Sequence, residues 1–425
     1  MEGMDDDQDD EEGDDDMGME VADEGAVPDR GNNASRIMQA HAEAVFCLAI
    51  DKSQRFFVTG GQDDLALVWS FETWQPLQTL KGHKDSVTAV GFSPDSAYVA
   101  TGAMDGEIKI WNVNDGEEVV SFDCGDDLKW LQWHPSAKFL LAGNAAGAVM
   151  MWSVPGGSMS YFSGHTDAIT EGCWLPSGRG FLTTAEDGTL IQWSPKTQDI
   201  VSKYDGRDNM FHQCPISAVA CHEDNTLVAT GGAEGAVKLI NLKNNRVLFS
   251  FENHGDNVET VAFSHSKPSL LATGGLDGKI FIYTVDHHEL RQTLEHEGPV
   301  VKVLWHPTLP VLYSCSVDGT IRVWDGRTGE QLHMCVGHRN HVLDFDISRD
   351  GFGILSVSED TTIMYFQIRS SGSHSRANKN AFKTSTMRKS WASVSRDVTH
   401  TWNLRRFMNA GGNKTPTPNQ QTKVV

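Results

Sequence analysis

A sequence unit that recurs along most of the chain constrains the fold more than any other feature. In six copies a histidine is followed 22 or 23 residues later by an aspartate, and six residues after that by an aromatic residue. Two degenerate copies fill the gaps, with Ala146 and Glu234 in the aspartate place. The closing positions are 41 to 47 residues apart and define eight repeats. These positions are Trp69, Trp111, Trp152, Trp193, Ile240, Tyr283, Trp324 and Phe366.

Each repeat predicts four short β-strands separated by turns. In the second repeat, strands are expected at 86–93, 98–101 and 107–113, with turns at Pro94-Asp95 and Asp105-Gly106. A single sheet of this size cannot bury its own faces, so such units stack radially around an axis. The sequence therefore predicts an all-β fold, an eight-bladed β-propeller.

The recurring polar residues have a structural explanation. A serine or threonine stands four residues before each aspartate, so histidine, hydroxyl, aspartate and indole can link into one hydrogen-bonded tetrad. The third repeat has Ala142 and Ala146 in two of these places, and we expect apolar packing to replace the tetrad there. The clearest predicted tetrads are His83, Thr101, Asp105 and Trp111; His165, Thr183, Asp187 and Trp193; and His296, Ser314, Asp318 and Trp324.

Charge divides the chain into three regions. Residues 1–31 carry a net charge of −14 and lack apolar periodicity, which predicts a disordered acidic leader. Residues 369–425 carry +10 and predict a basic, disordered tail. The propeller, residues 32–368, retains −18 of the total −22. Its last repeat has only three strands of its own, so we expect residues 32–40 to supply the missing closing strand.

Several protein classes do not fit this composition. The chain has no run of about 18 apolar residues, which disfavours membrane insertion. It opens with acidic residues instead of a secretory signal. Its seven cysteines are scattered and never form a C-x-x-C pair, which indicates reduced thiols and no zinc framework. We therefore expect a cytoplasmic protein, with a nuclear pool left open.

The combination of Ser/Thr, His and Asp also suggests a hydrolase. A nucleophilic enzyme needs one activated site with an oxyanion hole, whereas this set recurs six times on a scaffold that uses it for bracing. The chain has no G-x-S-x-G, H-E-x-x-H or phosphate-binding glycine motif. We predict a non-enzymatic protein with no catalytic residues, cofactor or metal.

The repeats resemble the WD-repeat family, through Gly82-His83, Gly164-His165, Gly337-His338 and the closing tryptophans. Within that class the chain resembles the angio-associated migratory cell protein family, most specifically in its unusual third repeat at 128–143 and in its acidic leader. That family is similar to a fungal ribosome-assembly WD-repeat protein that escorts one basic large-subunit ribosomal protein. The resemblance implies a WD-repeat propeller that binds other proteins. The basic segment after residue 369 departs from the family pattern.

A partner surface is expected at the mouth of the propeller channel. The positions beside the start of each innermost strand, and those just before the tetrad aspartates, hold carboxylates and a few large apolar side chains. This composition fits an extended basic client. The predicted partner-binding residues are Phe46, Met104, Asp126, Asp127, Glu186, Glu259 and Glu359.

Two functions remain open from the sequence. The acidic rim, the acidic leader and the resemblance favour an escort or chaperone for a basic ribosomal protein. The family name favours a cytoplasmic signalling adaptor in cell migration or angiogenesis. The charge of −18 disfavours nucleic acid as a partner of the propeller, although the basic tail could contact RNA. We expect a monomer.

Overall fold

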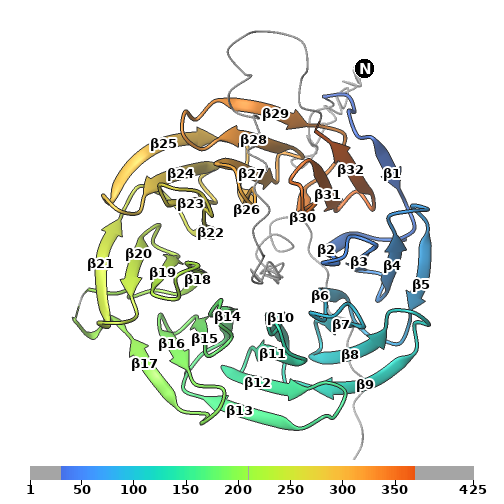
Figure 1. Ribbon diagram of the computed structural model, residues 1–425, viewed down its shortest axis with the longest axis horizontal. Coiled ribbons are helices and arrows are strands. Elements are labelled where there is room, and N and C mark those ends of the chain that lie inside the picture. The colour runs from blue at the N-terminus through green and yellow to red at the C-terminus, as the bar shows by residue number, and fades with distance from the viewer. Residues whose placement is uncertain (1–29, 209, 369–425) are drawn as a thin grey trace, which may run out of the picture.

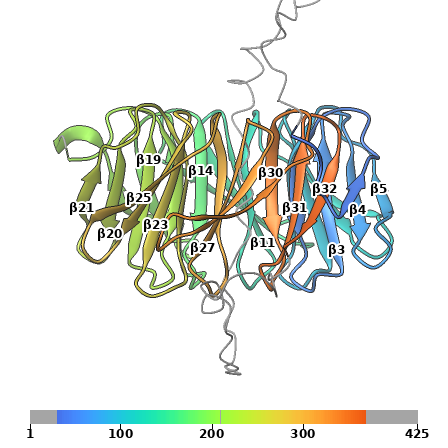
Figure 2. The same ribbon diagram turned by 90° about the horizontal axis from the view of Figure 1, so that it is seen from above.

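Eight four-stranded antiparallel sheets form a closed ring in the computed structural model, which describes residues 30–368 except position 209 (Figures 1 and 2). This architecture confirms the predicted all-β, eight-bladed propeller. The predicted acidic leader and basic tail lie outside the described residues, apart from positions 30 and 31. Predictions about those two segments therefore remain predictions.

The strands run outward from the channel within each blade. Blades one to four consist of β2 (Val45–Ile50), β3 (Phe56–Gly61), β4 (Ala66–Ser70), β5 (Pro76–Leu80); β6 (Val87–Phe92), β7 (Tyr98–Ala103), β8 (Glu107–Asn112), β9 (Glu118–Asp123); β10 (Leu128–Trp133), β11 (Phe139–Asn144), β12 (Ala148–Ser153), β13 (Met159–Ser163); and β14 (Ile169–Trp174), β15 (Phe181–Ala185), β16 (Leu190–Trp193), β17 (Ile200–Tyr204).

A short 3₁₀ helix, η1 (Gly206–Asp208), leads into the second half of the ring. Blades five to eight consist of β18 (Ile216–Cys221), β19 (Leu227–Gly232), β20 (Val237–Asn241), β21 (Arg246–Phe251); β22 (Val258–Phe263), β23 (Leu270–Gly275), β24 (Lys279–Thr284), β25 (Glu289–Glu295); β26 (Val300–Trp305), β27 (Val311–Ser316), β28 (Ile321–Asp325), β29 (Gln331–Cys335); and β30 (Val342–Ile347), β31 (Gly353–Ser358), β32 (Ile363–Gln367), β1 (Arg36–Met38).

The eighth blade is completed by the N-terminal strand. Strand β1 pairs antiparallel with β32, with Arg36 opposite Tyr365 and Met38 opposite Ile363. The side chain of Met38 is buried in a cluster that also contains Val45 of blade one. The two ends of the propeller are therefore joined by a backbone ladder, which leaves no open edge on β32.

The core lies between the blades. Each apolar cluster combines side chains of two neighbouring sheets, so the inner strands are buried on both faces and read as nearly continuous apolar runs. Trp133 of blade three, for example, donates its indole N–H to the Gly91 carbonyl of blade two at 3.0 Å. This burial on both faces explains why the alternation of apolar and polar residues in the sequence is imperfect.

Buried polar side chains satisfy the free edges of the innermost strands. Asp344 of β30 accepts a hydrogen bond from the backbone N–H of Leu48 at 2.9 Å, across the junction of blades eight and one. Glu171 of β14 accepts a hydrogen bond from the backbone N–H of Val219 on the next blade at 2.7 Å. Each carboxylate thus supplies an acceptor that the innermost strand lacks, because that strand has a ladder partner on one side only.

Candidate functional site

One rim of the ring carries all the tetrad histidines, and we call it the histidine rim. It consists of the segments that enter each innermost strand and the turns between the second and third strands. Helix η1 marks this rim at the upper left of Figure 2. The histidine rim comprises residues 39–44, 62–65, 81–86, 104–106, 124–127, 145–147, 164–168, 186–189, 205–208, 210–215, 233–236, 252–257, 276–278, 296–299, 317–320, 336–341 and 359–362.

The fourth blade shows the tetrad geometry. His165 places Nε2 2.8 Å from the hydroxyl of Thr183 and Nδ1 3.4 Å from Asp187. The Trp193 indole donates to the same hydroxyl at 2.8 Å. Because the carboxylate can only accept, the neutral imidazole carries its proton on Nδ1, and the hydroxyl donates to Nε2. The tetrad is therefore a directed chain from indole to carboxylate.

The seventh blade repeats this arrangement. His296 lies 3.0 Å from Asp318 and 2.7 Å from Ser314, and the Trp324 indole donates to Ser314 at 2.9 Å. The Ser314 hydroxyl has no solvent exposure and already accepts the indole proton. A nucleophile must reach its substrate, so this buried hydroxyl braces the blade and does not attack a bond.

Asp105 of blade two departs from the predicted tetrad. His83 and Trp111 both bond to Thr101, at 2.6 and 2.8 Å, but Nδ1 of His83 has no hydrogen-bond partner. The Asp105 side chain instead accepts from the backbone N–H of Glu107. The Glu107 carboxylate lies 3.8 Å from Nδ1 of His83. It forms a closer ion pair, at 2.9 Å, with the Lys109 ammonium.

The polar set of blade five escaped the sequence analysis, which treated that repeat as degenerate. His212 lies 2.9 Å from Thr230 and 2.7 Å from Glu234, at the same spacings as in the other repeats. A spacing pattern that allows glutamate in the aspartate position would have identified this set. Cys214 lies within 4.8 Å of the ligand atoms of this pair, but both imidazole nitrogens of His212 already have hydrogen-bond partners in Glu234 and Thr230.

A threonine two residues after the aspartate was also missed. Thr189 donates to Asp187 at 2.7 Å and lies 2.9 Å from the imidazole of His165. Thr320 and Thr362 occupy the same place in blades seven and eight. The signal for it is the pattern Asp-x-Thr, present in three repeats.

Blade three lacks the tetrad but keeps one polar brace. Cys124 stands in the histidine place, and buried Asn144 donates to its carbonyl oxygen at 2.6 Å and accepts from the N–H of Ala148 at 2.9 Å. Trp152 stacks on Phe122 with ring centroids 5.0 Å apart. The expectation of apolar packing alone is therefore incomplete, because a single amide holds the turn.

The tetrads make stability sensitive to acid. Burial alone would raise the pKa of Asp360, but hydrogen bonds from His338 and Thr362 outweigh it and lower the pKa to about 2. The pKa values of Asp187, Asp277, Asp318 and Glu234 are lowered in the same way. A lowered carboxyl pKa stabilises the fold above its unfolded value near 4, and this contribution is lost as the pH falls through the folded value.

We therefore predict that the melting temperature falls steeply between pH 4 and pH 2. Below pH 6.5 a smaller loss begins, because burial lowers the pKa of His83 to about 4 and protonation then favours the unfolded chain. Thermal melts from pH 7 to pH 2 measure both effects. Asp360→Asn should lower stability at pH 7 and flatten the acid slope; an unchanged slope would contradict the assignment.

The structure places six of the predicted partner-binding residues where solvent reaches them. Glu186, Glu259, Met104 and Asp127 are half-buried, and Asp126 and Glu359 are exposed. Phe46 differs, since its side chain is 4% exposed and packs with Ala44 and Leu343. The neighbouring blade covers this ring, so Phe46 is not a surface contact.

Some of these carboxylates already have neighbours within the chain. Glu359 lies 3.0 Å from Nδ1 of His341, and Asp127 lies 3.9 Å from the Lys129 ammonium. Glu259 accepts a hydrogen bond from the side-chain amide of Asn257. Glu186, Met104 and Asp126 are related to these residues by position, since they lie on the histidine rim.

Acidic side chains crowd the rim at blades one and two. The pKa of Asp64 is raised by its partial burial and by the negative charges of Asp85, Asp63, Glu43 and Asp105. Burial is the first cause of this raised pKa, and the four neighbouring carboxylates add to it because like charges disfavour ionisation. Asp64 was not among the predicted partner-binding residues; it lies in the turn immediately after Asp63.

A cavity of about 150 Å³ lies at the opposite end of the channel. It is lined by the last residues of the innermost strands of blades three to eight, including Gln132, Trp174 and Trp305. The thiols of Cys173 and Cys221 approach to 2.7 Å at its wall. The cavity is therefore separate from the residues of the histidine rim.

Comparison with known proteins agrees with this architecture. The WD domain, G-beta repeat model matches residues 32–70, 74–112, 156–194, 209–241, 245–284, 288–325 and 329–367. Every blade except the third is thus matched, in keeping with the unusual polar set of that blade. The chain is a WD-repeat propeller, a class of scaffold that binds other proteins.

Within the WD-repeat class, the chain is similar to one particular family. The human angio-associated migratory cell protein is 37% identical over 345 residues, covering 77% of this chain and 79% of the relative. This protein belongs to the angio-associated migratory cell protein family, which confirms the resemblance seen in the sequence. Among the described residues, no helix has the length and apolar content needed to cross a bilayer.

Solved structures of the Sqt1 protein share the fold. Chaetomium thermophilum Sqt1 bound to the N-terminus of ribosomal protein L10 superimposes with a TM-score of 0.74 at 26% identity, covering 79% of this chain and all of that one. Saccharomyces cerevisiae Sqt1 superimposes with a TM-score of 0.72 at 21% identity, covering 80% and 99%, and supports the fold alone.

Proposed function

We propose that this protein is a non-enzymatic escort that binds a basic ribosomal protein on the histidine rim before assembly. The observation that carries the proposal is the gathering of solvent-accessible carboxylates on that rim, among them Asp126, Glu186 and Glu359. The propeller sequence as a whole carries −18, which attracts a cationic segment over a long range. The similarity to Sqt1 bound to the N-terminus of ribosomal protein L10 supports the same class of client.

The chemistry of the rim favours an extended, basic segment as the ligand. Glu186 on the histidine rim and Glu259, at the start of β22 directly beside it, can pair with lysine and arginine, and half-buried Met104 offers apolar contact. Charge complementarity would speed the encounter, and the apolar contacts would slow release. The buried tetrads below hold the turns that present these side chains, so the rim is preorganised for binding.

A charge-reversal experiment tests this proposal. We predict that Glu186→Lys combined with Glu259→Lys weakens binding of a labelled peptide from the N-terminus of ribosomal protein L10 by about 100-fold, as expected for two charge pairs turned repulsive. Fluorescence anisotropy at low and high salt measures the affinity, and salt should weaken the wild type more than the variant.

The matched control changes the same charge on the opposite rim. Glu72 and Asp199 are exposed and lie in turns between third and fourth strands. Glu72→Lys combined with Asp199→Lys should alter the affinity less than twofold. Equal loss in both double variants would show a response to net charge only and would contradict a rim site.

A signalling adaptor in cell migration is the second candidate, favoured by the name of the human relative alone. Affinity purification from cells separates the two functions. Recovery of ribosomal proteins that disappears with the rim variant supports the escort. Unchanged recovery of ribosomal proteins with that variant would remove the escort proposal.

A further inference from the structure

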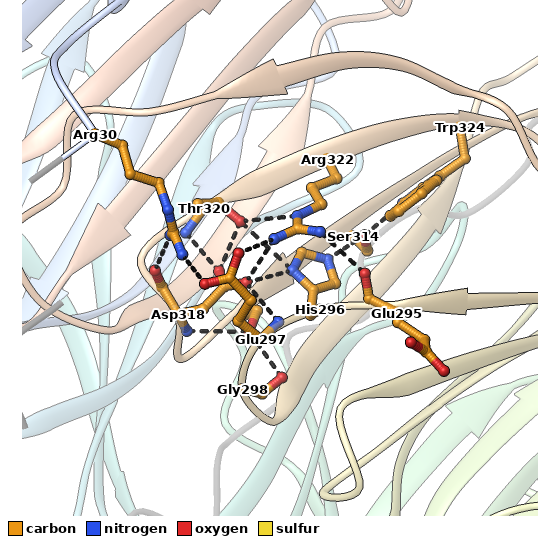
Figure 3. A network of polar contacts seen from close by, with 11 residues as sticks. Arg30, Glu295, His296, Glu297, Gly298, Ser314, Asp318, Thr320, Arg322 and Trp324 are labelled. Atoms are coloured by element: carbon orange, nitrogen blue, oxygen red, sulfur yellow. Dashed lines mark hydrogen bonds and ion pairs between the residues drawn. The ribbon is translucent and has the colours of Figure 1, made fainter. Parts of the chain in front are cut away.

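An arginine from the N-terminal segment is docked on the histidine rim at blade seven (Figure 3). Arg30 donates from Nη1 to the main-chain oxygen of Asp318 at 2.8 Å, and its Nη2 contacts the carboxylate of Glu297. Its side chain is only 18% exposed. The contact joins positions 288 residues apart, so it reflects tertiary docking and not local chain geometry.

The segment that carries Arg30 is held against the outer strand of the same blade. The backbone N–H of Asn33 donates to the carbonyl of Val336 at 2.9 Å, and its side-chain amide donates to the carbonyl of Met334 at 2.8 Å. These bonds fix the direction from which Arg30 reaches the rim. They lie outside the guanidinium contact, so Arg30 can leave while the segment stays bound.

The acceptors for Arg30 are fixed by the blade-seven tetrad. Asp318 accepts from the backbone N–H of Glu297 at 3.1 Å and from His296 at 3.0 Å. Arg322 lies 3.2 Å from the Asp318 carboxylate and donates to the carbonyl of Glu295 at 3.0 Å. The loop that presents Glu297 is therefore rigid before any ligand arrives.

Glu297 is nevertheless open to solvent. Its side chain is 65% exposed, with Oε2 against Arg30 and Oε1 3.5 Å from Arg322. A carboxylate beside a main-chain carbonyl matches the planar fork of a guanidinium, which can donate to both at once. A lysine ammonium is a point charge and gains less from this geometry.

We propose that Glu297 and the main-chain oxygen of Asp318 form an arginine-binding subsite, which Arg30 occupies in the free chain and an arginine of a basic client takes over. This inference rests on the proposed function. An ion pair to a carboxylate as exposed as Glu297 is weak, so a client that brings several arginines can displace one intramolecular arginine. Arg30 thus competes with the client for the subsite, so a client must bind tightly enough to displace it.

The test uses the full chain and a labelled nonapeptide in which arginine alternates with glycine, with a lysine version as the second probe. Arg30→Ala should tighten binding of the arginine peptide about threefold, with a smaller gain for the lysine peptide. Glu297→Gln should weaken arginine-peptide binding about threefold. Adding Arg30→Ala to Glu297→Gln should not tighten binding of the arginine peptide, because the subsite for which Arg30 competes is already lost.

Arg339→Ala is the matched control. Arg339 is an exposed arginine on the same rim whose removal changes the net charge equally. The subsite would be overturned if Arg30→Ala increased the affinity for the arginine peptide no more than Arg339→Ala does. It would also be overturned if the gain from Arg30→Ala persisted in the Glu297→Gln background. In either case the peptide would still bind, and the proposed function would stand. Failure of the wild type to bind either peptide would instead refute the proposed function.

Proteolysis gives a readout that needs no client. Trypsin cleaves after arginine, and a docked Arg30 is protected. Glu297→Gln should accelerate cleavage between Arg30 and Gly31 about fivefold, measured by mass spectrometry of the released fragment, whereas Arg339→Ala should leave the rate unchanged. Equal rates in the wild type and the Glu297 variant would contradict docking of Arg30 in the free chain.

Discussion

Replacing Lys302 by methionine is expected to destabilise the propeller by about 3 to 5 kcal/mol, the cost of leaving one member of a buried ion pair without its partner. The Lys302 ammonium lies 2.7 Å from Asp344, and both side chains are at most 5% exposed. Asp344 also accepts the N–H of Leu48, so its uncompensated charge would lie at the junction where the ring closes. Urea unfolding followed by tryptophan fluorescence measures the loss.

Two further variants isolate the charge. Lys279→Met removes an exposed lysine and should change the free energy of unfolding by less than about 0.5 kcal/mol. Adding Asp344→Asn to Lys302→Met removes the orphaned charge and should recover part of the loss. A midpoint for Lys302→Met equal to that of the exposed control would contradict a structural role for the pair.

The ion pair also has a definite pH dependence. Burial would lower the pKa of Lys302, but the charges of Asp344 and Asp346 raise it above its ordinary value of 10.5. A raised lysine pKa gives stabilisation that is complete below the unfolded value and is lost as the pH rises through the folded value. In the alkaline range, the difference in unfolding free energy between wild type and Lys302→Met should therefore narrow as the pH rises above about 10.5.

Deletion of residues 32–40 should lower the free energy of unfolding by roughly 5 kcal/mol. The deletion removes the three paired residues of β1 and the buried side chain of Met38, and each of these terms costs on the order of 1 to 3 kcal/mol. It also opens the edge of β32, which favours pairing between molecules. Thermal melting and sedimentation measure both consequences.

A pair of point variants on the same strand provides the control. Met38 is 7% exposed and faces the core, whereas Ile37 is 54% exposed. Met38→Ala should cost about 2 to 3 kcal/mol and Ile37→Ala less than about 0.5 kcal/mol. A deletion variant that melts at the wild-type temperature would show that the ring is closed without this strand.

The number and order of the blades could be read from the sequence because each blade is a local unit. A histidine and its hydroxyl partner are 18 residues apart in the repeats of His165 and His212, and the turn between them is set by neighbouring residues. Strict spacing therefore reports the histidine–hydroxyl pair directly, although Asp105 of blade two keeps the spacing without bonding to His83. A pattern that requires aspartate classes the repeat of Glu234 as degenerate, although Glu234 makes the same contact with a longer side chain.

Contacts between blades could not be read in this way. Phe46 fits the pattern of a residue that faces the channel mouth, but Leu343 covers it from a strand almost 300 positions away. Lys302 and Asp344 each look like a polar interruption of an apolar strand, and Arg30 looks like one base in an acidic leader. Nothing local in the sequence pairs these residues with their partners.

The repeat period and the residues within each unit, by themselves, determined the blade count, most of the tetrads and the acidic character of the histidine rim, since those depend on hydrogen bonds and turns that span about 20 residues. Only the closed ring decided which side chains are covered, which buried charges are compensated and where Arg30 docks. The physical reason is that closure brings together innermost strands from different repeats, and their free edges and faces acquire partners that no spacing along the chain records.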